Sequence, residues 1–181
     1  MTEDLRYPIG KLADQSFTGK EAFSEELKKN AIKDIQFLPQ HIETAILNLH
    51  EAQLNTPYRH EGWTVKQVVH HVADSHMNAY IRFKLGLTED NPTIKPYEEG
   101  EWALLPDTQN IPVNISLTLL YALHTRWVEV LKHIKDADWQ RTVFHPEHKK
   151  EMTLWTLLAM YAWHGKHHTA HITKLRERHG W

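Results

Sequence analysis

The sequence predicts an all-α protein, a four-helix bundle with a long loop between its second and third helices. Apolar residues recur at steps of three and four in four long segments, which is typical of amphipathic helices. No stretch alternates strongly enough to indicate a sheet. A chain of 181 residues suits one core. We therefore expect residues 1–181 to form a single domain, with residues 1–20 as an N-terminal arm.

The first two helices have recognisable starts. The first apolar stripe begins after Ser24, and Pro39 within it is expected to kink the helix or divide it in two. Thr64 and Gln67 form a capping box, in which each side chain bonds the backbone of the other. The second helix is therefore predicted to begin at Thr64 and to continue to about Leu87.

The connection that follows is unusually long. Residues 88–113 contain four prolines, at positions 92, 96, 106 and 112, and are predicted to be mostly loop. A short helix is expected near 98–105. Connections of this length usually serve as a lid or as a crossover between helices.

The C-terminal part contains the other two helices. The third is expected to open near Asn114 or Ser116. Residues 141–153 alternate weakly, which indicates a small hairpin or an irregular loop. The last helix is predicted to run from Thr153 to Gly180, a residue typical of helix C-caps.

Composition excludes several classes of protein. The 21 Lys and Arg are balanced by 23 Asp and Glu, so no basic footprint for nucleic acid is expected. No apolar run approaches the length of about 18 residues that indicates a membrane span, and the N-terminus lacks a secretory signal. We therefore expect a cytoplasmic protein without a nucleic-acid or membrane partner. With no cysteine and 15 histidines, any metal would be held by imidazole or carboxylate.

A histidine pair on the last helix is the strongest chemical signal. His164 and His168 are four residues apart, which places their Cβ atoms about 5–6 Å from each other on one helix face. This spacing occurs in helical zinc motifs. The pair lies on the stripe expected to face the core, where neutral imidazoles need polar partners. A metal would supply them, although hydrogen-bonded core histidines or a solvated pair would fit the same spacing.

A third ligand is expected from a neighbouring helix. The candidates are His70, His71, His76 and His124. His70 and His71 point about 100° apart, so only one of them can enter the site. His76 lies nearest the centre of the apolar stripe. Periodicity therefore slightly favours His76 and does not select His71.

Two segments that contain these histidines resemble a known family. Residues 63–76 (WTVKQVVHHVADSH) and 163–172 (WHGKHHTAHI) are similar to the signature segments of the DinB-like superfamily, and more closely to its YfiT-type branch of metal-dependent hydrolases. The resemblance extends over nearly the whole chain, including 7–10, 80–84 and 123–127. It implies a four-helix bundle, a homodimer and one zinc or nickel ion per chain. The ligands that it implies are His71, His164 and His168, whereas His70, His76, His167 and His171 are additional.

Three histidine ligands would leave an open coordination position, as in catalytic metal sites. That position can hold water, with its pKa lowered to about 7, or a substrate thiol as thiolate. Hydrolytic His-Glu-x-x-His motifs carry a glutamate as base, but Gly165 stands at that place and the last helix has no carboxylate before Glu177. A base could instead come from His76, His124 or the acidic residues of 88–113.

The sequence therefore leaves three functions open. The family resemblance implies a metal-dependent hydrolase of a small-molecule substrate. It also implies a rival, a thiol S-transferase using a low-molecular-weight thiol such as bacillithiol, since a metal-bound thiolate needs no base. A structural or sensing metal site is the non-enzymatic alternative, and a fourth histidine ligand would favour it.

Other polar residues have plainer interpretations. Arg82, Lys84 and Arg126 would suit an anionic substrate, but solvated surface charges are the favoured interpretation for each. His124 is expected to be a core histidine bonded to a carbonyl. Trp163, beside the histidine pair, is expected to be a packing residue.

Overall fold

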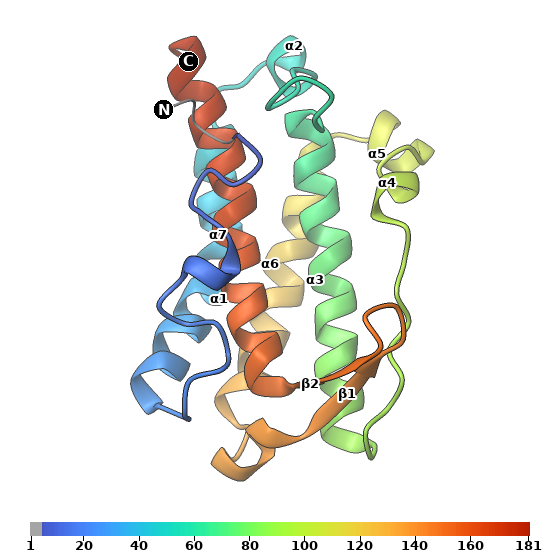
Figure 1. The fold of residues 1–181 in the computed structure, drawn as a ribbon. Helices are drawn as coiled ribbons and strands as arrows, with labels where there is room; N and C mark the ends of the chain where they lie inside the picture. The colour runs from blue at the N-terminus through green and yellow to red at the C-terminus, as the bar shows by residue number, and fades with distance from the viewer. Residues whose placement is uncertain (1–4) are drawn as a thin grey trace.

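The computed structural model describes residues 5–181, in which four long helices lie side by side (Figure 1). They are α1 (Glu25–Ile46), α3 (Val65–Thr88), α6 (Val113–Lys132) and α7 (Leu154–His179). The short elements are η1 (Leu12–Asp14), α2 (Glu51–Leu54), α4 (Glu99–Trp102), α5 (Pro106–Asn110), η2 (Asp136–Gln140), β1 (Thr142–His145) and β2 (Lys150–Thr153). The predicted four-helix bundle is confirmed. Among the described residues, no helix has the length and apolar character needed to span a bilayer.

Helices α1 and α3 occupy opposite corners of the bundle. Each packs against α6 and α7, and neither packs substantially against the other. Helices α3 and α6 both run from the top to the bottom of Figure 1, whereas α1 and α7 run upwards. The chain that leaves the end of α3 must therefore return along the length of α3, about 36 Å for its 24 residues, before α6 can begin. The long connection between α3 and α6 is this crossover.

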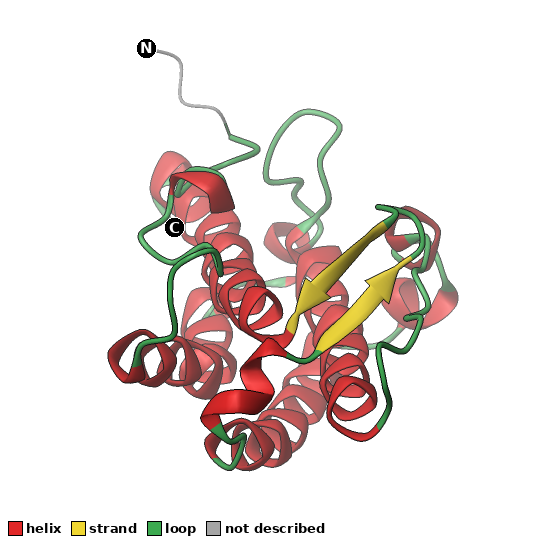
Figure 2. Cartoon of the chain, turned by 60° about the horizontal axis from the view of Figure 1, so that its bottom comes forward, coloured by secondary structure: helices red, strands yellow, loops and turns green. Residues whose placement is uncertain are grey.

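The crossover forms backbone hydrogen bonds with the β-hairpin. The backbone N–H of Ile94 donates to the Phe144 carbonyl at 3.0 Å, and that of Phe144 donates to the Pro92 carbonyl at 2.9 Å. Strands β1 and β2 pair antiparallel, with Val143 opposite Met152 (Figure 2). Residues 141–153, predicted to be a hairpin or an irregular loop, thus form a hairpin.

Local sequence signals set the helix ends as predicted. The Ser24 side chain accepts a hydrogen bond from the backbone N–H of Leu27 at the start of α1. At the start of α3, Thr64 and Gln67 form the reciprocal capping box. Gly180 ends α7 in the left-handed conformation, with φ of 68°.

Pro39 does not divide the first helix. Helix α1 is continuous from Glu25 to Ile46 with Pro39 inside it. Proline lacks the N–H that would bond the carbonyl four residues earlier, here that of Ile35. The ring of His124 on α6 takes the place of that donor, with its Nδ1 atom 2.6 Å from the Ile35 oxygen. A partner from another helix thus satisfies the carbonyl that Pro39 leaves free.

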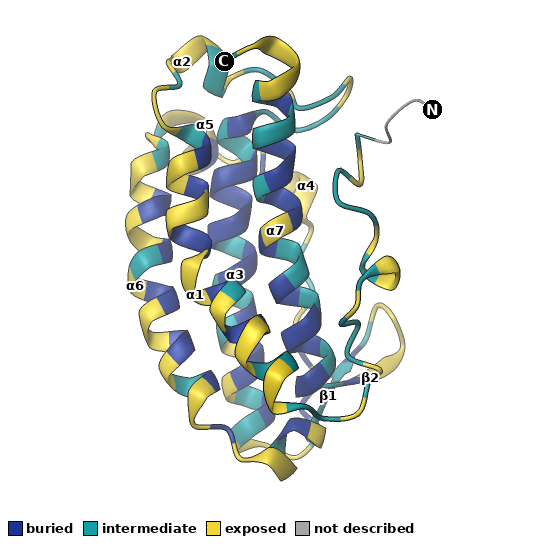
Figure 3. Cartoon of the chain, turned by 90° about the vertical axis from the view of Figure 1, so that its left-hand side faces the viewer, coloured by how far each residue is buried: buried dark blue, intermediate teal, exposed yellow. Residues whose placement is uncertain are grey.

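Buried residues lie on the inner faces of the long helices (Figure 3). The apolar ones form a core in two parts, with buried histidines between them along the helices. One part is built around Trp127 and Trp155, and the other around Leu38, Val72 and Ile172. The intervening level includes the rings of His71, His76, His124, His164 and His168. Helices α3, α6 and α7 thus present imidazoles between the two apolar parts, whereas α1 contributes none.

The N-terminal arm lies against α7. The indole N–H of Trp163 donates to the Gly10 carbonyl at 3.2 Å, and that of Trp155 donates to the Glu21 carbonyl at 2.8 Å. Trp163 is thus a packing residue that also fixes the arm. Because the arm is held along α7, it can form one wall of a cavity beside that helix.

Candidate metal centre

Three histidines converge between α3 and α7. One ring nitrogen each from His71, His164 and His168 lies within 4.8 Å of the other two. The Nε2 atoms of His71 and His164 are 3.4 Å apart. Of the histidines on α3, the structure brings His71 to the pair on α7, rather than His70 or His76. Within residues 5–181, this group contains imidazoles only.

The geometry of this group fits a divalent ion. Two nitrogens about 2.0–2.1 Å from a tetrahedral zinc ion lie about 3.4 Å apart. The Nδ1 atom of His168 is buried and has no hydrogen-bond partner among the described residues. Burial lowers the pKa of His71 to about 4 and holds those of His164 and His168 well below the ordinary value. The rings are therefore neutral at physiological pH, which is the form that binds metal.

Two further histidines lie behind His164. The Nε2 atom of His76 is 3.2 Å from Nδ1 of His164, and Nδ1 of His76 is 3.1 Å from Nε2 of His124. His76 is fully buried and His124 is 2% exposed. The expected carbonyl partner of His124 is the Ile35 oxygen described above. Sequence periodicity placed His76 at the centre of the apolar stripe of α3. In the structure, His76 lies behind His164 and is not a member of the three-histidine group.

The other histidines near the group have different partners. His70 pairs through Nδ1 with the Ser116 hydroxyl at 2.7 Å. His167 stacks on Trp163 with ring centroids 4.4 Å apart, and His171 stacks on Tyr58 at 3.9 Å. These three therefore lie outside the converging group.

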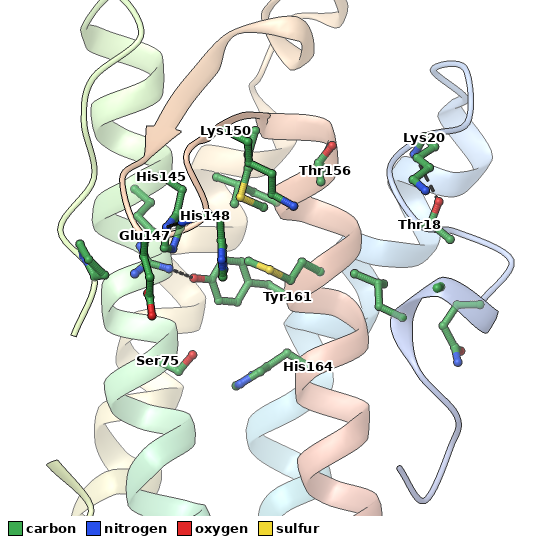
Figure 4. Close-up of a pocket in the computed structure, with 18 of the residues that line it drawn as sticks. Thr18, Lys20, Ser75, His145, Glu147, His148, Lys150, Thr156, Tyr161 and His164 are labelled. Carbon is green, nitrogen blue, oxygen red and sulfur yellow. Dashed lines mark hydrogen bonds between the residues drawn. The ribbon is translucent and has the colours of Figure 1, made fainter. Parts of the chain in front are cut away.

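A cavity of about 790 Å³ opens beside the group. Its walls come from α3, α7, the N-terminal arm, the crossover and the β-hairpin, and His71 and His164 are part of its lining (Figure 4). This volume lies in the range of small-molecule sites, about 300–1,000 Å³. The arm and the hairpin face each other across the cavity, so segments far apart in sequence enclose it.

Arg82 is a buried part of this wall, so its interpretation as a solvated surface charge is wrong. Its side chain is 9% exposed and lines the cavity. One guanidinium nitrogen donates to the Tyr161 hydroxyl at 2.8 Å and another donates to the Lys95 carbonyl at 3.3 Å. No carboxylate among the described residues forms a salt bridge with it. Lys84 and Arg126 instead lie on the surface beside the Tyr80 ring.

Tyr161 presents its hydroxyl to the cavity, one turn before His164 on α7 (Figure 4). A guanidinium can only donate, so the hydroxyl of Tyr161 accepts from Arg82 and keeps its own proton for another acceptor. Burial raises the pKa of Tyr161, so the hydroxyl stays protonated. Nothing in the spacing of residues indicated that Tyr161 pairs with Arg82.

Acidic groups are sparse near the three histidines. Glu21, Glu99 and Glu147 line the cavity, and Glu21 already accepts hydrogen bonds from Thr18 and Gly19. Asp74 is half-buried and lies outside the lining, and burial, together with Asp107, raises its pKa to about 6. Of the candidate bases in 88–113, only Glu99 reaches the cavity wall.

Fold and site together define a four-helix-bundle protein with a candidate three-histidine metal centre beside a small-molecule cavity. The chain belongs to the DinB superfamily, whose sequence pattern matches residues 35–172.

Relatives are similar over their full length. A protein of Bacillus mycoides strain KBAB4 named "Putative metal-dependent hydrolase" is 54% identical over 179 residues, covering 99% of both chains. A protein of the same description from Bacillus cereus strain B4264 is 54% identical over 98% of this chain and 99% of its own. The solved structure of YfiT from Bacillus subtilis, described as a probable metal-dependent hydrolase with an unusual four-helix bundle topology, superposes with a TM-score of 0.92 at 45% identity over 98% of each chain.

Proposed function

We propose that this protein is a metal-dependent hydrolase of a small molecule, with His71, His164 and His168 holding one zinc or nickel ion. The observation that carries the proposal is a group of three neutral imidazoles, of which two, His71 and His164, line a cavity of about 790 Å³. Within the described chain the group includes no fourth protein ligand. Catalytic zinc sites leave a position open in this way, whereas structural sites are closed. The names of the relatives support the same class.

The chain's own residues can assist a hydrolysis. When bound, the ion supplies Lewis-acid chemistry, polarising a substrate oxygen and lowering the pKa of a coordinated water or thiol. Tyr161 donates its free hydroxyl proton in a hydrogen bond to the substrate oxygen that gains negative charge. Arg82 holds that hydroxyl in place and is itself a buried cation facing the substrate. The arm and hairpin exclude water from the other side of the substrate.

The test is a panel of ester, amide and phosphoester substrates on metal-reconstituted protein. We expect metal-dependent hydrolysis, and Tyr161→Phe should lower kcat about 10²–10³-fold, as removal of one oxyanion donor does elsewhere. Metal content should not change. Tyr121→Phe is the matched control, because Tyr121 is on α6 and bonds Glu43 away from the cavity. Full activity of Tyr161→Phe would show that Tyr161 does not donate to the substrate oxygen. The absence of hydrolysis across the panel would contradict the proposed hydrolase activity.

One observation favours a second candidate, a thiol S-transferase. Position 165, where hydrolytic helical motifs carry their base, faces α1. A Cβ atom built on Gly165 would lie 2.8 Å from Cδ2 of Leu38. No residue at that position could reach the cavity. A thiol ionised by the metal needs no such base, and a low-molecular-weight thiol such as bacillithiol would fit the cavity.

A conjugation assay with thiol and electrophile separates the two enzymes. Turnover that requires both metal and thiol would establish the transferase, and hydrolysis without thiol would remove it. Tight metal binding with neither activity would favour a structural or sensing site instead.

A further inference from the structure

We infer that Pro39 determines, through Ile35, His124 and His76, which nitrogen of His164 carries the proton, and so leaves the lone pair of Nε2 free for the candidate metal centre. The four groups that form this relay come from four different helices: the Ile35 carbonyl from α1, His124 from α6, His76 from α3 and His164 from α7. The inference rests on the proposed metal function only where it concerns metal affinity. The hydrogen-bond directions follow from the geometry and from the neutral state of the buried rings.

The relay begins with a carbonyl that has lost its helical donor. Pro39 has no N–H, so the Ile35 oxygen is left without the usual bond within α1. His124 Nδ1 lies 2.6 Å from that oxygen. A carbonyl oxygen can only accept, so the proton of this bond is on His124 Nδ1. This one assignment fixes the others.

Each neutral imidazole ring of the relay carries one N–H proton, so it donates through one nitrogen and accepts through the other. Burial lowers the pKa of His124 to about 4, so the ring is neutral and its Nε2 carries a lone pair. That lone pair accepts from His76 Nδ1, at 3.1 Å. His76 is fully buried, and the partners of its two ring nitrogens are imidazole nitrogens rather than carboxylates. With its proton on Nδ1, its Nε2 in turn accepts from His164 Nδ1, at 3.2 Å. All three histidines therefore carry their proton on Nδ1.

The end of the relay is a lone pair directed at the metal centre. With its proton on Nδ1, His164 has its lone pair on Nε2, the atom that lies 3.4 Å from Nε2 of His71. Neutral imidazole in water prefers the opposite arrangement, with the proton on Nε2. The relay thus holds His164 in the less common tautomer, which is the one that can bind a metal through Nε2. His76 and His124 are positioning residues in this account, and hydrogen bonds of this kind raise the basicity of a ligating histidine.

The same bonds exclude a role for His76 and His124 as fourth ligands. Both ring nitrogens of His76 are engaged, with His124 and with His164. Both nitrogens of His124 are engaged as well, with His76 and with the Ile35 oxygen. Neither ring has a free lone pair for an ion.

The direct test is the tautomeric state of the histidines in ¹⁵N-labelled protein, from long-range ¹H–¹⁵N correlations. We expect His76, His124 and His164 to show the Nδ1–H form in both metal-free and zinc-loaded protein. An Nε2–H form at any of the three in metal-free protein would overturn the inference. This measurement needs neither a variant nor a substrate.

Zinc affinity gives an independent readout, measured by competition with a chelator. His76→Ala and His124→Ala should each weaken zinc binding about 10–100-fold, as loss of such outer partners does elsewhere. His76→Gln, which can still donate and accept, should recover part of the loss. His70→Ala is the matched control, since His70 is buried on the same helix but bonds Ser116.

Pro39→Ala tests the origin of the relay. It restores an N–H that competes for the Ile35 oxygen, so we expect a mixture of tautomers at His124 and weaker zinc binding. Equal zinc affinity in His76→Ala and His70→Ala would overturn the relay. If the wild type shows the expected tautomers but binds neither zinc nor nickel, the proposed metal function fails while the relay stands.

Discussion

Gly19 packs against Thr156 so closely that a Cβ atom at position 19 would lie 2.4 Å from the Thr156 α-carbon. Gly19 also has a φ of +81°, in the region that favours glycine. Its neighbours Thr18 and Lys20 line the cavity. This contact between the N-terminal arm and the first turn of α7 therefore positions a wall of the candidate active site.

We predict that Gly19→Ala destabilises the protein and disturbs the cavity. The left-handed backbone and the clash with the backbone of α7 together should cost on the order of 1–3 kcal/mol. Chemical denaturation measures the free energy of unfolding. Gly10→Ala is the control, because Gly10 has a φ of +78° but its nearest contacts would be at 3.5 Å. Equal losses in the two variants would show that backbone conformation alone, and not the contact with Thr156, accounts for the effect.

Metal content should discriminate between the ligand histidines of α3 and α7 and their neighbour His167. We predict that His71→Ala, His164→Ala and His168→Ala each lose bound metal on dialysis, and that the losses at His164 and His168 are equally severe. His167→Ala should retain its metal, since that ring stacks on Trp163. Elemental analysis of the purified variants is the measurement. Loss of metal in His167→Ala together with its retention in His164→Ala would show that the ligand face of α7 is misassigned.

Chelation should leave a folded but less stable bundle. The two apolar clusters do not depend on the ion, so the helical circular dichroism should persist at 25 °C. A ligand present at 100 times its Kd stabilises by about 2.7 kcal/mol, and each kcal/mol shifts the thermal midpoint of a chain this size by about 2–4 °C. We therefore expect the midpoint to fall by about 5–10 °C on chelation. Complete unfolding at 25 °C would mean that the ion is required for the fold.

Acid should weaken the metal-free protein over a defined range. The pKa values of His71 and His124 are lowered to about 4 by burial, whereas an unfolded histidine titrates near 6.5. Between these values the unfolded state binds more protons, so stability falls as pH decreases from about 6.5 towards 4. Asp74 acts in the opposite direction, because its raised pKa of about 6 lets the folded state take up a proton first.

The measurement is the free energy of unfolding at a series of pH values, with and without metal. Protons compete with the metal for the same nitrogens, so bound metal should be released as pH falls, towards the lower end of the range, where the rings of the folded protein begin to take up protons. The histidines outnumber Asp74, so a net loss of stability is expected. A flat profile from about pH 7 to pH 4 would contradict the burial of these rings as neutral groups.

Capping residues and apolar stripes predicted the four long helices well, but they did not predict how these helices pack against one another. The stripe of α1 showed which of its faces is buried but not which helix covers it, so the diagonal placement of α1 and α3 could not be predicted. Of the two outcomes expected at Pro39, a kink or a division, the division does not occur, and His124, distant in sequence, supplies the missing donor. Tertiary partners of this kind leave no trace in the spacing of apolar residues.

Residue spacing predicted part of the candidate site, and the family resemblance predicted another part. The spacing of His164 and His168 brought the pair to one face, but the choice of His71 over His76 came from the family resemblance, since both lie near the buried stripe of α3. Arg82 reads as a surface cation until the crossover and the hairpin cover it. The ligand role of the histidines, the metal's identity, the homodimer and the cytoplasmic location stay predictions.

The corner-to-corner placement of α1 and α3 also has a consequence for the order of folding. Only the short helix α2 separates these two long helices in the chain. They nevertheless do not form a helical hairpin with each other, because each buries its stripe against α6 and α7. A nascent chain that ends before residue 113 therefore contains two amphipathic helices and none of the surfaces that cover them. The contacts that stabilise α1 span a large sequence separation, which raises the contact order above that of an up-and-down bundle and slows folding. The apolar stripes of α1 and α3 therefore stay exposed to solvent until α6 and α7 have been synthesised.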